Sequence, residues 1–171
     1  MTLTPVMQKF VLHWGEMGTK WGINRTVAQI HALLYLSPEP LTAEDIADTL
    51  GVARSNVSTS LRELQAWGIV KVSHVMGDRR DHFESMADVW DMFRVILDQR
   101  KRREADPTRA ILRECLESAK GEDPHTRERL QAMAGFFDQA TAIYDQLSRW
   151  PTPALQRLLR LGDRVRKLLG L

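Results

Sequence analysis

The stretch from Leu41 to Phe83 decides the fold: LTAEDIADTLGVARSNVSTSLRELQAWGIVKVSHVMGDRRDHF. Its pattern predicts two short helices joined by a tight turn and followed by a two-stranded hairpin with a basic tip. This order of elements is typical of a winged helix-turn-helix, a module that places its second helix in the major groove of DNA. Helices are expected on both sides of it, so the predicted fold class is mainly α.

The first helix of the stretch is expected to begin after Thr42, whose hydroxyl can accept a hydrogen bond from the amide of Asp45. Glu44 and Asp45 place negative charge in the first turn, where the helix dipole favours it. Gly51 is expected to end the helix, because glycine accepts a positive φ without steric cost.

The second helix is predicted over about Ala53 to Trp67, with Val57, Leu61 and Leu64 on its buried face. Its opposite face and flanks carry polar side chains that we predict to bind DNA: Arg54, Ser55, Asn56, Ser58, Thr59 and Arg62. Small side chains let the backbone approach the groove, and long donors reach base edges or phosphates. Ala53 cannot cap this helix with its side chain, so we expect a weak start for which Ser55 is the candidate substitute.

The hairpin after this helix is predicted from β-branched residues between Ile69 and Val75, with a turn at residues 76–81 and a return strand from His82. Arg79 and Arg80 lie at its tip, where they suit a phosphate backbone or a narrow minor groove. A polar helix face and an Arg-Arg turn are each also typical of ordinary solvated surface. Their combination in this order is what favours DNA binding.

Three segments resemble the GbsR-like branch of the MarR superfamily of bacterial winged-helix regulators. They are WGINRTVAQIHALLYLSPEPLTAEDIA (21–47), GVARSNVSTSLRELQAWGIV (51–70) and GDRRDHF (77–83), and the resemblance extends over about Met17 to Leu116. It implies a dimeric regulator, most simply a repressor, whose double-stranded DNA binding can respond to a small-molecule effector. The resemblance also implies quaternary ammonium compounds such as choline or glycine betaine as effectors, and aromatic rings are suitable walls for such cations. Packing in the core and at hinges explains the five tryptophans better than binding of such cations does.

The chain is expected to have three regions: an N-terminal dimerisation helix and loop (1–23), the winged helix-turn-helix (24–87) and a helical dimerisation region (88–171). Four X-Pro pairs predict helix starts, with the first residue of each pair as N-cap: Thr4-Pro5, Asp106-Pro107, Asp123-Pro124 and Thr152-Pro153. The first helix is expected to end at about Gly15 or Met17, where Gly15, Gly18 and Gly22 break the chain into a loop around Trp21.

The C-terminal region is predicted to contain a helix from Asp88 to about Arg103, a short helix over 108–120 and a long helix over 124–150. The short helix is expected to face inward with Ile111, Leu112, Cys115 and Leu116. The long helix carries two apolar stripes. One stripe can cover its own subunit and the other can meet a partner, which predicts a homodimer; burial in a monomeric core is the alternative. The last helix, about 153–169, is amphipathic and basic.

Composition sets the remaining limits. The net charge is only +2, so any DNA-binding surface must be local. A single cysteine allows no disulfide within the chain, and no signal peptide or membrane-length apolar run is apparent, so we expect a cytoplasmic protein without membrane contact. The histidines and Cys115 show no metal-ligand spacing, and no catalytic or cofactor motif appears. We expect no enzyme, metal or cofactor.

The alternative function is a winged-helix module for protein–protein interaction without sequence-specific DNA binding.

Overall fold

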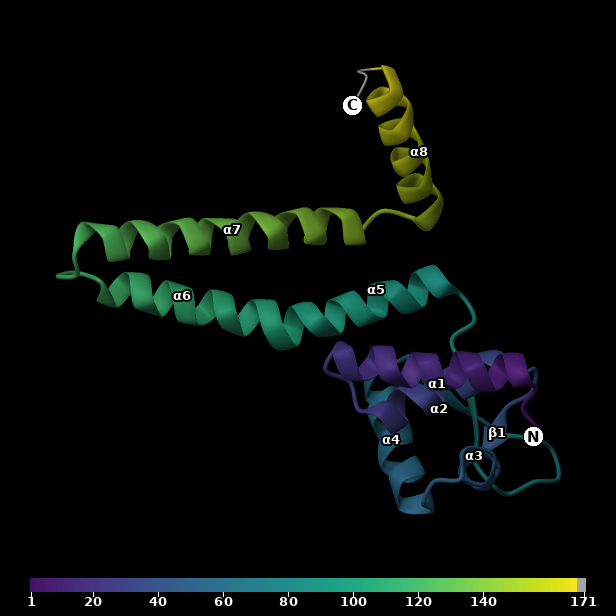
Figure 1. The fold of residues 1–171 in the computed structure, drawn as a ribbon. Helices are drawn as coiled ribbons and strands as arrows, with labels where there is room; N and C mark the ends of the chain where they lie inside the picture. The colour runs from purple at the N-terminus through teal and green to yellow at the C-terminus, as the bar shows by residue number, and fades with distance from the viewer. Residues whose placement is uncertain (169–171) are drawn as a thin grey trace. The chain divides into compact units, whose positions relative to one another are not determined.

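A computed structural model of the chain describes residues 1–168, without the side chains of Leu159 and residues 162–168. The described chain is mainly helical with one small antiparallel sheet, so the predicted class and the winged helix-turn-helix are confirmed (Figure 1). Its internal contacts define two compact units, the first comprising Met1–Val95 and the second beginning at Ile96. Each is described by itself.

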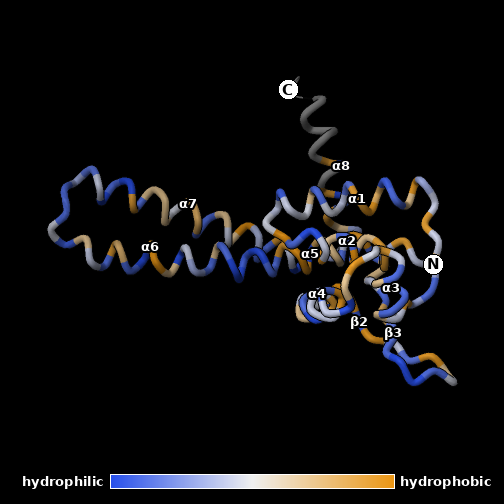
Figure 2. Tube along the Cα trace, turned by 60° about the horizontal axis from the view of Figure 1, so that its bottom comes forward, coloured by the Kyte–Doolittle hydropathy of each residue, from blue (hydrophilic) through white to orange (hydrophobic). Residues whose placement is uncertain are grey.

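The first unit is built around α2 (Arg25–Leu36), which packs against α1 (Pro5–Lys20), α3 (Ala43–Leu50), α4 (Arg54–Trp67) and the sheet. Hydrophobic residues gather around α2 (Figure 2). The fully buried side chains that form this core come from α2, α3, α4 and the residue before the second strand: Ile30, Leu33, Ile46, Val57, Leu61, Leu64 and Ile69.

The sheet has three strands in the order β1-β3-β2, where the sequence predicted two. β2 (Val70–Ser73) and β3 (His82–Ser85) form the expected hairpin, and β1 (Leu41–Thr42) pairs with the other edge of β3, with Leu41 opposite Phe83. A two-residue strand shows no alternating pattern, and Thr42 also caps α3, so the sequence revealed only the helix start. The hairpin is thereby joined to the start of α3.

Helix α1 extends to Lys20, so the predicted loop at Gly15 and Gly18 was wrong. Both glycines are buried where α1 packs against α2. A Cβ at Gly18 would lie 2.5 Å from the Cβ of Ala28, and one at Gly15 would lie 2.6 Å from Cγ of Gln29. The glycines therefore allow the two helices to approach closely, and the break comes only at Gly22, whose φ is +76°.

The second unit begins within α5 (Val89–Arg100), which continues without a gap through the π-helix η1 (Lys101–Ala105) into α6 (Asp106–Ser118). The predicted break before Asp106-Pro107 was therefore wrong. Pro107 cannot donate a hydrogen bond to the carbonyl four residues earlier, and its ring crowds that turn. The wider π turn accommodates it: the Asp106 amide donates to the Lys101 carbonyl, and Thr108 Oγ1 donates to the Glu104 carbonyl at 2.6 Å.

The remaining helices are α7 (Pro124–Ser148) and α8 (Thr152–Leu168). The predicted caps at Thr4 and Asp123 are confirmed, since their side chains accept from the amides of Met7 and Thr126. Thr152 is instead the first residue of α8. Much of the predicted amphipathic pattern of that helix lies outside the described side chains: Leu159, Arg164, Val165, Arg166, Lys167 and Leu168.

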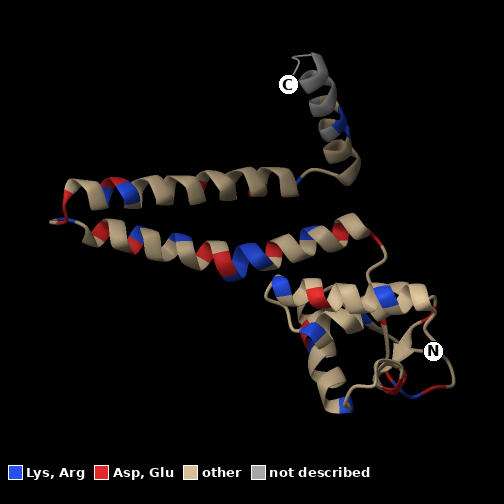
Figure 3. Cartoon of the chain, in the orientation of Figure 1, with Lys and Arg blue, Asp and Glu red and all other residues tan. Residues whose placement is uncertain are grey.

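Helices α6 and α7 pack along each other, and charged residues lie on both (Figure 3). Ion pairs join the two helices. Asp138 accepts from Arg109 Nη2 at 2.6 Å and from Arg113 Nη2 at 3.2 Å. Ile111 and Cys115 were predicted to face inward, but in the single chain both are exposed. The α6–α7 contact therefore covers only part of the apolar surface of α6.

The close approach of α1 and α2 gives a stability prediction. We expect Gly18→Ala to lower the free energy of unfolding by about 1–3 kcal/mol, because the added methyl overlaps Ala28. Gly135→Ala is the matched control: Gly135 lies in α7 with open space around its Cβ position, and alanine there should stabilise by up to about 1 kcal/mol. Urea unfolding measures both, and a stabilising Gly18→Ala would contradict the packing role.

Candidate nucleic-acid interface

Helix α4 divides into a buried face and an exposed polar face. Val57, Ser60, Leu61, Leu64 and Trp67 are buried. The six residues of this helix that the sequence singled out are all exposed: Arg54, Ser55, Asn56, Ser58, Thr59 and Arg62. The buried side fixes the helix against the unit, so the exposed side presents its donors and hydroxyls from a rigid element.

Two of these side chains already contact each other. Arg62 lies back along α4, where Nη2 donates to Thr59 Oγ1 at 3.4 Å and Nε donates to the Ser58 carbonyl at 3.4 Å. Both bonds are long and therefore weak. An acceptor on a ligand can replace them at small cost, so Arg62 is positioned near Thr59 while remaining available for a stronger partner.

The hairpin tip is organised by Asp78, a residue that the sequence analysis did not single out. Its carboxylate accepts from the Arg80 backbone amide at 3.0 Å, from Arg80 Nε at 3.0 Å and from Nη2 at 2.5 Å. These hydrogen bonds hold the pKa of the Asp78 carboxyl well below its usual range. The available signal was an aspartate two residues before an arginine in a turn, a spacing at which Asp bonds the following backbone.

His82 completes this arrangement from the start of β3. Its Nδ1 lies 3.0 Å from the Arg80 carbonyl and its Nε2 lies 3.6 Å from Asp78 Oδ2, and the residue is buried. Arg79, by contrast, is exposed and makes no hydrogen bond or ion pair with any residue that the structure describes. The two adjacent arginines thus differ: Arg80 is held in place, and Arg79 is unengaged.

Acidic residues at the start of α3 interact with both regions that are predicted to contact DNA, the start of α4 and the hairpin tip. Glu44 forms an ion pair with Arg54 at the start of α4. The pKa of Arg80 is raised mainly by Asp78 and further by the charges of Asp45 and Glu44. Asp45 is itself fixed, because its carboxylate accepts from the Thr42 amide at 3.0 Å in a capping box. The start of α4 and the hairpin tip therefore share one electrostatic neighbourhood.

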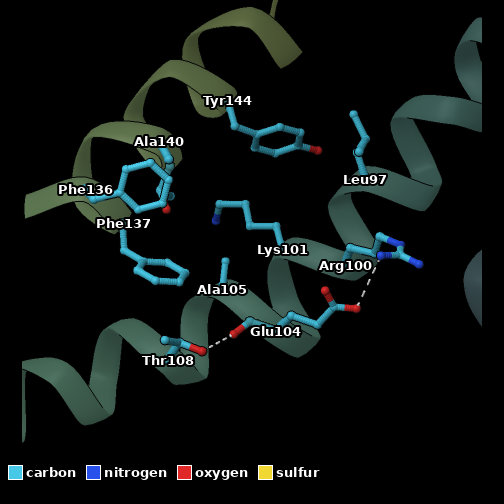
Figure 4. A pocket seen from close by; sticks show the side chains of 11 residues that line it. Leu97, Arg100, Lys101, Glu104, Ala105, Thr108, Phe136, Phe137, Ala140 and Tyr144 are labelled. Atoms are coloured by element: carbon cyan, nitrogen blue, oxygen red, sulfur yellow. Dashed lines mark hydrogen bonds and ion pairs between the residues drawn. The ribbon is translucent and has the colours of Figure 1, made fainter. Parts of the chain in front are cut away.

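The second unit contains a separate groove of about 400 Å³ between α5–η1–α6 and α7 (Figure 4). Its walls include Leu97, Phe136, Phe137, Ala140 and Tyr144. Lys101 projects into it, but its ammonium lies 3.2 Å from Asp106 and 3.6 Å from Asp145. Because that charge is already compensated, the groove mainly offers apolar surface.

No group of three or more His, Cys, Asp or Glu residues in the described part of the chain could hold a metal ion. Among the described helices, none combines the length and apolar character needed to span a membrane.

A protein-family model matches part of the chain. Residues 21–81 match the model of the MarR family. The matched segment contains α2, α3, α4, β2 and the hairpin tip, which are the elements that carry the exposed residues described above. A search of functionally characterised proteins found no match to the chain.

Among solved structures, one described as a transcriptional regulator has a TM-score of 0.67 with 21% identity, covering 84% of this chain and 96% of that chain. This likeness establishes the fold. A Staphylococcus aureus MepR mutant bound to an oligodeoxyribonucleotide reaches a TM-score of 0.40 at 18% identity, covering 80% of this chain and 89% of its own. MepR itself, a transcription regulator of the multidrug efflux pump MepA, reaches 0.37 at 14% identity, with 95% and 93% covered. These two likenesses are too weak to support an inference.

The start of α4 gives a prediction, because Ala53 has the extended backbone of an N-cap but makes no side-chain cap bond, as the sequence predicted. No hydrogen bond from Ser55 replaces it among the described residues. We expect Ala53→Ser to raise the free energy of unfolding by about 0.5–2 kcal/mol. Thr4→Ala, which removes an existing cap on α1, should change stability in the opposite direction. The midpoint of urea unfolding measures both variants. If Ala53→Ser does not raise the free energy of unfolding, the amides at the start of α4 already have their hydrogen-bond partners.

Proposed function

We propose that this protein is a sequence-specific, DNA-binding transcription regulator that acts as a homodimer in the cytoplasm and belongs to the GbsR-like branch of the MarR superfamily. The exposed polar face of α4 carries the proposal, because a helix with a buried apolar side and six outward donors or hydroxyls suits a major groove. The hairpin with its fixed and free arginines supports it, and so does the family match over residues 21–81.

In this proposal, helix α4 and the hairpin make different contacts with DNA. Thr59 and Arg62 read base edges, since they project from the middle of α4 on the side opposite Val57 and Leu61. Arg54, Ser55, Asn56 and Ser58 position the helix on the DNA. Arg79 and Arg80 bind a phosphate backbone or a narrow minor groove beside it. Repression follows from the resemblance: a dimer bound at a promoter blocks access to it.

The dimer is proposed from apolar surface that a single chain leaves exposed. On α7, Met133, Phe136 and Ile143 are 51%, 63% and 58% exposed, and Ile111 on α6 is 59% exposed. Phe136 also lines the groove in Figure 4, so this surface includes a concave part. Monomeric proteins rarely expose large contiguous apolar patches. We therefore propose that residues 88–171, together with 1–23, build the interface.

The alternative function is a winged-helix module that binds another protein. The two functions differ in their response to salt, because neutralising phosphates releases counterions and makes DNA affinity fall steeply as salt rises. Binding of the full chain to duplexes selected from a random pool, measured across a salt series, separates them. An inverted repeat with half-sites about one helical turn apart is the expected site for a two-fold dimer.

Arg62→Ala should lower affinity for the selected site by about 1–3 kcal/mol per half-site and relax the preference at one base position, if the arginine contacts a base through two hydrogen bonds. Affinity for a scrambled duplex should change little. Because Arg62 is exposed, circular dichroism should show an unchanged fold. Equal losses on both duplexes would make Arg62 a phosphate anchor and not a reading residue.

The double variant Arg79→Ala/Arg80→Ala is the matched contrast on the hairpin. It should weaken binding to all duplexes alike and reduce the salt slope by about one unit for each phosphate that the variant no longer neutralises. If it keeps the affinity and slope of the wild type, the hairpin does not contact DNA.

The proposed interface gives a prediction about mass. Light scattering at micromolar concentration should give twice the 19.6 kDa of one chain, and Phe136→Glu/Ile143→Glu should give one chain mass, because two charges would be buried unpaired. Val75→Glu/Met76→Glu adds the same charges at exposed apolar residues of the hairpin turn and should leave the dimer intact. A wild type at 19.6 kDa, or a dimeric α7 variant, would contradict the interface.

A further inference from the structure

The hairpin between β2 and β3 carries an apolar side chain at its tip. Met76 is fully exposed, more so than any other large hydrophobic side chain that the structure describes, and its neighbour Val75 is exposed as well. The hairpin projects away from the helices of the first unit (Figure 2). Packing within the described chain therefore does not account for a methionine at this position.

The backbone that carries Met76 is an ordered turn. The Asp78 amide donates to the Val75 carbonyl at 3.1 Å, and Gly77 has a φ of +85°. This combination is typical of a type II turn, in which Met76 and Gly77 occupy the two central positions. The Asp78 carboxylate accepts from the Arg80 amide at 3.0 Å, which joins the turn to the residues that follow it. Because this backbone is already ordered, inserting the Met76 side chain into a partner costs little further backbone entropy.

We infer that Met76 inserts between two neighbouring base pairs in the minor groove and kinks the duplex. The inference rests on the proposed function and adds bending of the DNA to it. Proteins that bind the minor groove frequently use apolar wedges, methionine among them, and these wedges partly unstack the base step that they enter. An unbranched, flexible methionine suits a narrow gap. Arg79, exposed three residues further on, suits the phosphates that line the groove.

The free energy cost of unstacking depends on the DNA sequence. Pyrimidine–purine steps, TA and CA/TG, are the most easily kinked. The thioether of Met76 is only a weak acceptor, so this residue selects a site through the deformability of the step and not through hydrogen bonds to bases. We therefore expect preferred sites to contain a pyrimidine–purine step in the minor groove that flanks the bases contacted by α4.

A lipid surface is the competing partner for an exposed apolar tip. Attachment to an anionic membrane is favoured by an excess of cations beside the apolar residues. Residues 74–81 contain two arginines and two aspartates, so this loop has no net charge when its histidine is neutral. Binding to a duplex does not need a net charge on the loop, because the exposed face of α4 in the same unit supplies the main contacts. The duplex is therefore the better partner.

The test uses the full chain and a duplex selected from a random pool, with 2-aminopurine at each flanking adenine in turn and a pair of energy-transfer dyes at the ends. Wild type should raise the 2-aminopurine fluorescence at one position, because unstacking relieves its quenching, and should bring the duplex ends closer. Met76→Ser should abolish both signals and weaken binding by about tenfold, because the apolar burial that offsets unstacking is lost. The salt slope should not change, since no charge is removed. Met76→Leu replaces one wedge by another and should keep both signals.

A second duplex, in which a stiff A-tract step replaces the kinked step, tests the choice of sequence. Wild type should bind it about tenfold more weakly than the selected duplex, because the full cost of unstacking is no longer offset. Met76→Ser should bind the two duplexes alike, which would show that the residue and the step are coupled.

A bound duplex that stays straight, with no rise in fluorescence at any position, would overturn the inference and leave the proposed function intact. A Met76→Ser variant that keeps both signals would overturn it as well. Binding of wild type to phosphatidylserine vesicles, together with a straight duplex, would assign the tip to a lipid surface. If no duplex binds at any salt concentration, the proposed function fails and the inference fails with it. Circular dichroism is the control for folding, which should be unchanged because Met76 is fully exposed.

Discussion

The burial of α2 on nearly all sides is the constraint on which the first unit depends. Seven of its twelve residues are buried, from Val27 to Leu34 with a single interruption at Gln29. A helix of this kind cannot exist in water alone, because its apolar surface must be covered by neighbours. α1, α3, α4 and β3 all pack on it. The position of α4, and hence of its exposed polar face, is therefore set by contacts on the buried side of this helix.

Electrostatic interactions then restrict the orientation of side chains on the elements that packing holds in place. The acidic start of α3 serves three purposes: Asp45 closes the capping box, Glu44 pairs with Arg54, and both charges act on Arg80. Each exposed pair contributes little to stability. Their effect is to limit where the arginines point before any partner arrives, and Asp78 does the same at the hairpin tip. A pre-oriented arginine loses less side-chain entropy on binding a phosphate or base.

The sequence predicted the elements whose signals are local. The caps at Thr42, Thr4 and Asp123 follow from side-chain chemistry within three residues, and the buried face of α4 follows from helical periodicity. All eight residues proposed to contact DNA are exposed, as that periodicity and the turn pattern required, although their contacts remain a prediction. The close α1–α2 approach could not be predicted, because glycine at a helix contact and glycine in a loop look alike until the facing residue, Ala28, is known.

Other features depended on partners distant in the chain. Leu41 and Thr42 form a strand only because Phe83 and His82 lie beside them. Ile111 and Cys115 were expected inward because their spacing marks an apolar face, but a single chain does not cover that face. The role of Asp78 was not predicted, although an aspartate two residues before Arg80 carries its own turn signal.

The π-helix at Lys101–Ala105 has a consequence for how this chain tolerates changes in length. A π turn holds one more residue than an α turn, and each residue of an α-helix advances the side-chain direction by about 100°. Removing one residue within the π turn would close it to an ordinary α turn, so the side chains after the deletion would keep their direction about the helix axis. Arg109 would still face Asp138, and the contact between α6 and α7 would be kept. A deletion in the α-helical parts on either side would instead rotate all later side chains by about 100° relative to the earlier ones. The phase between the two halves of this continuous helix is therefore preserved by a deletion inside the π turn and lost by a deletion outside it.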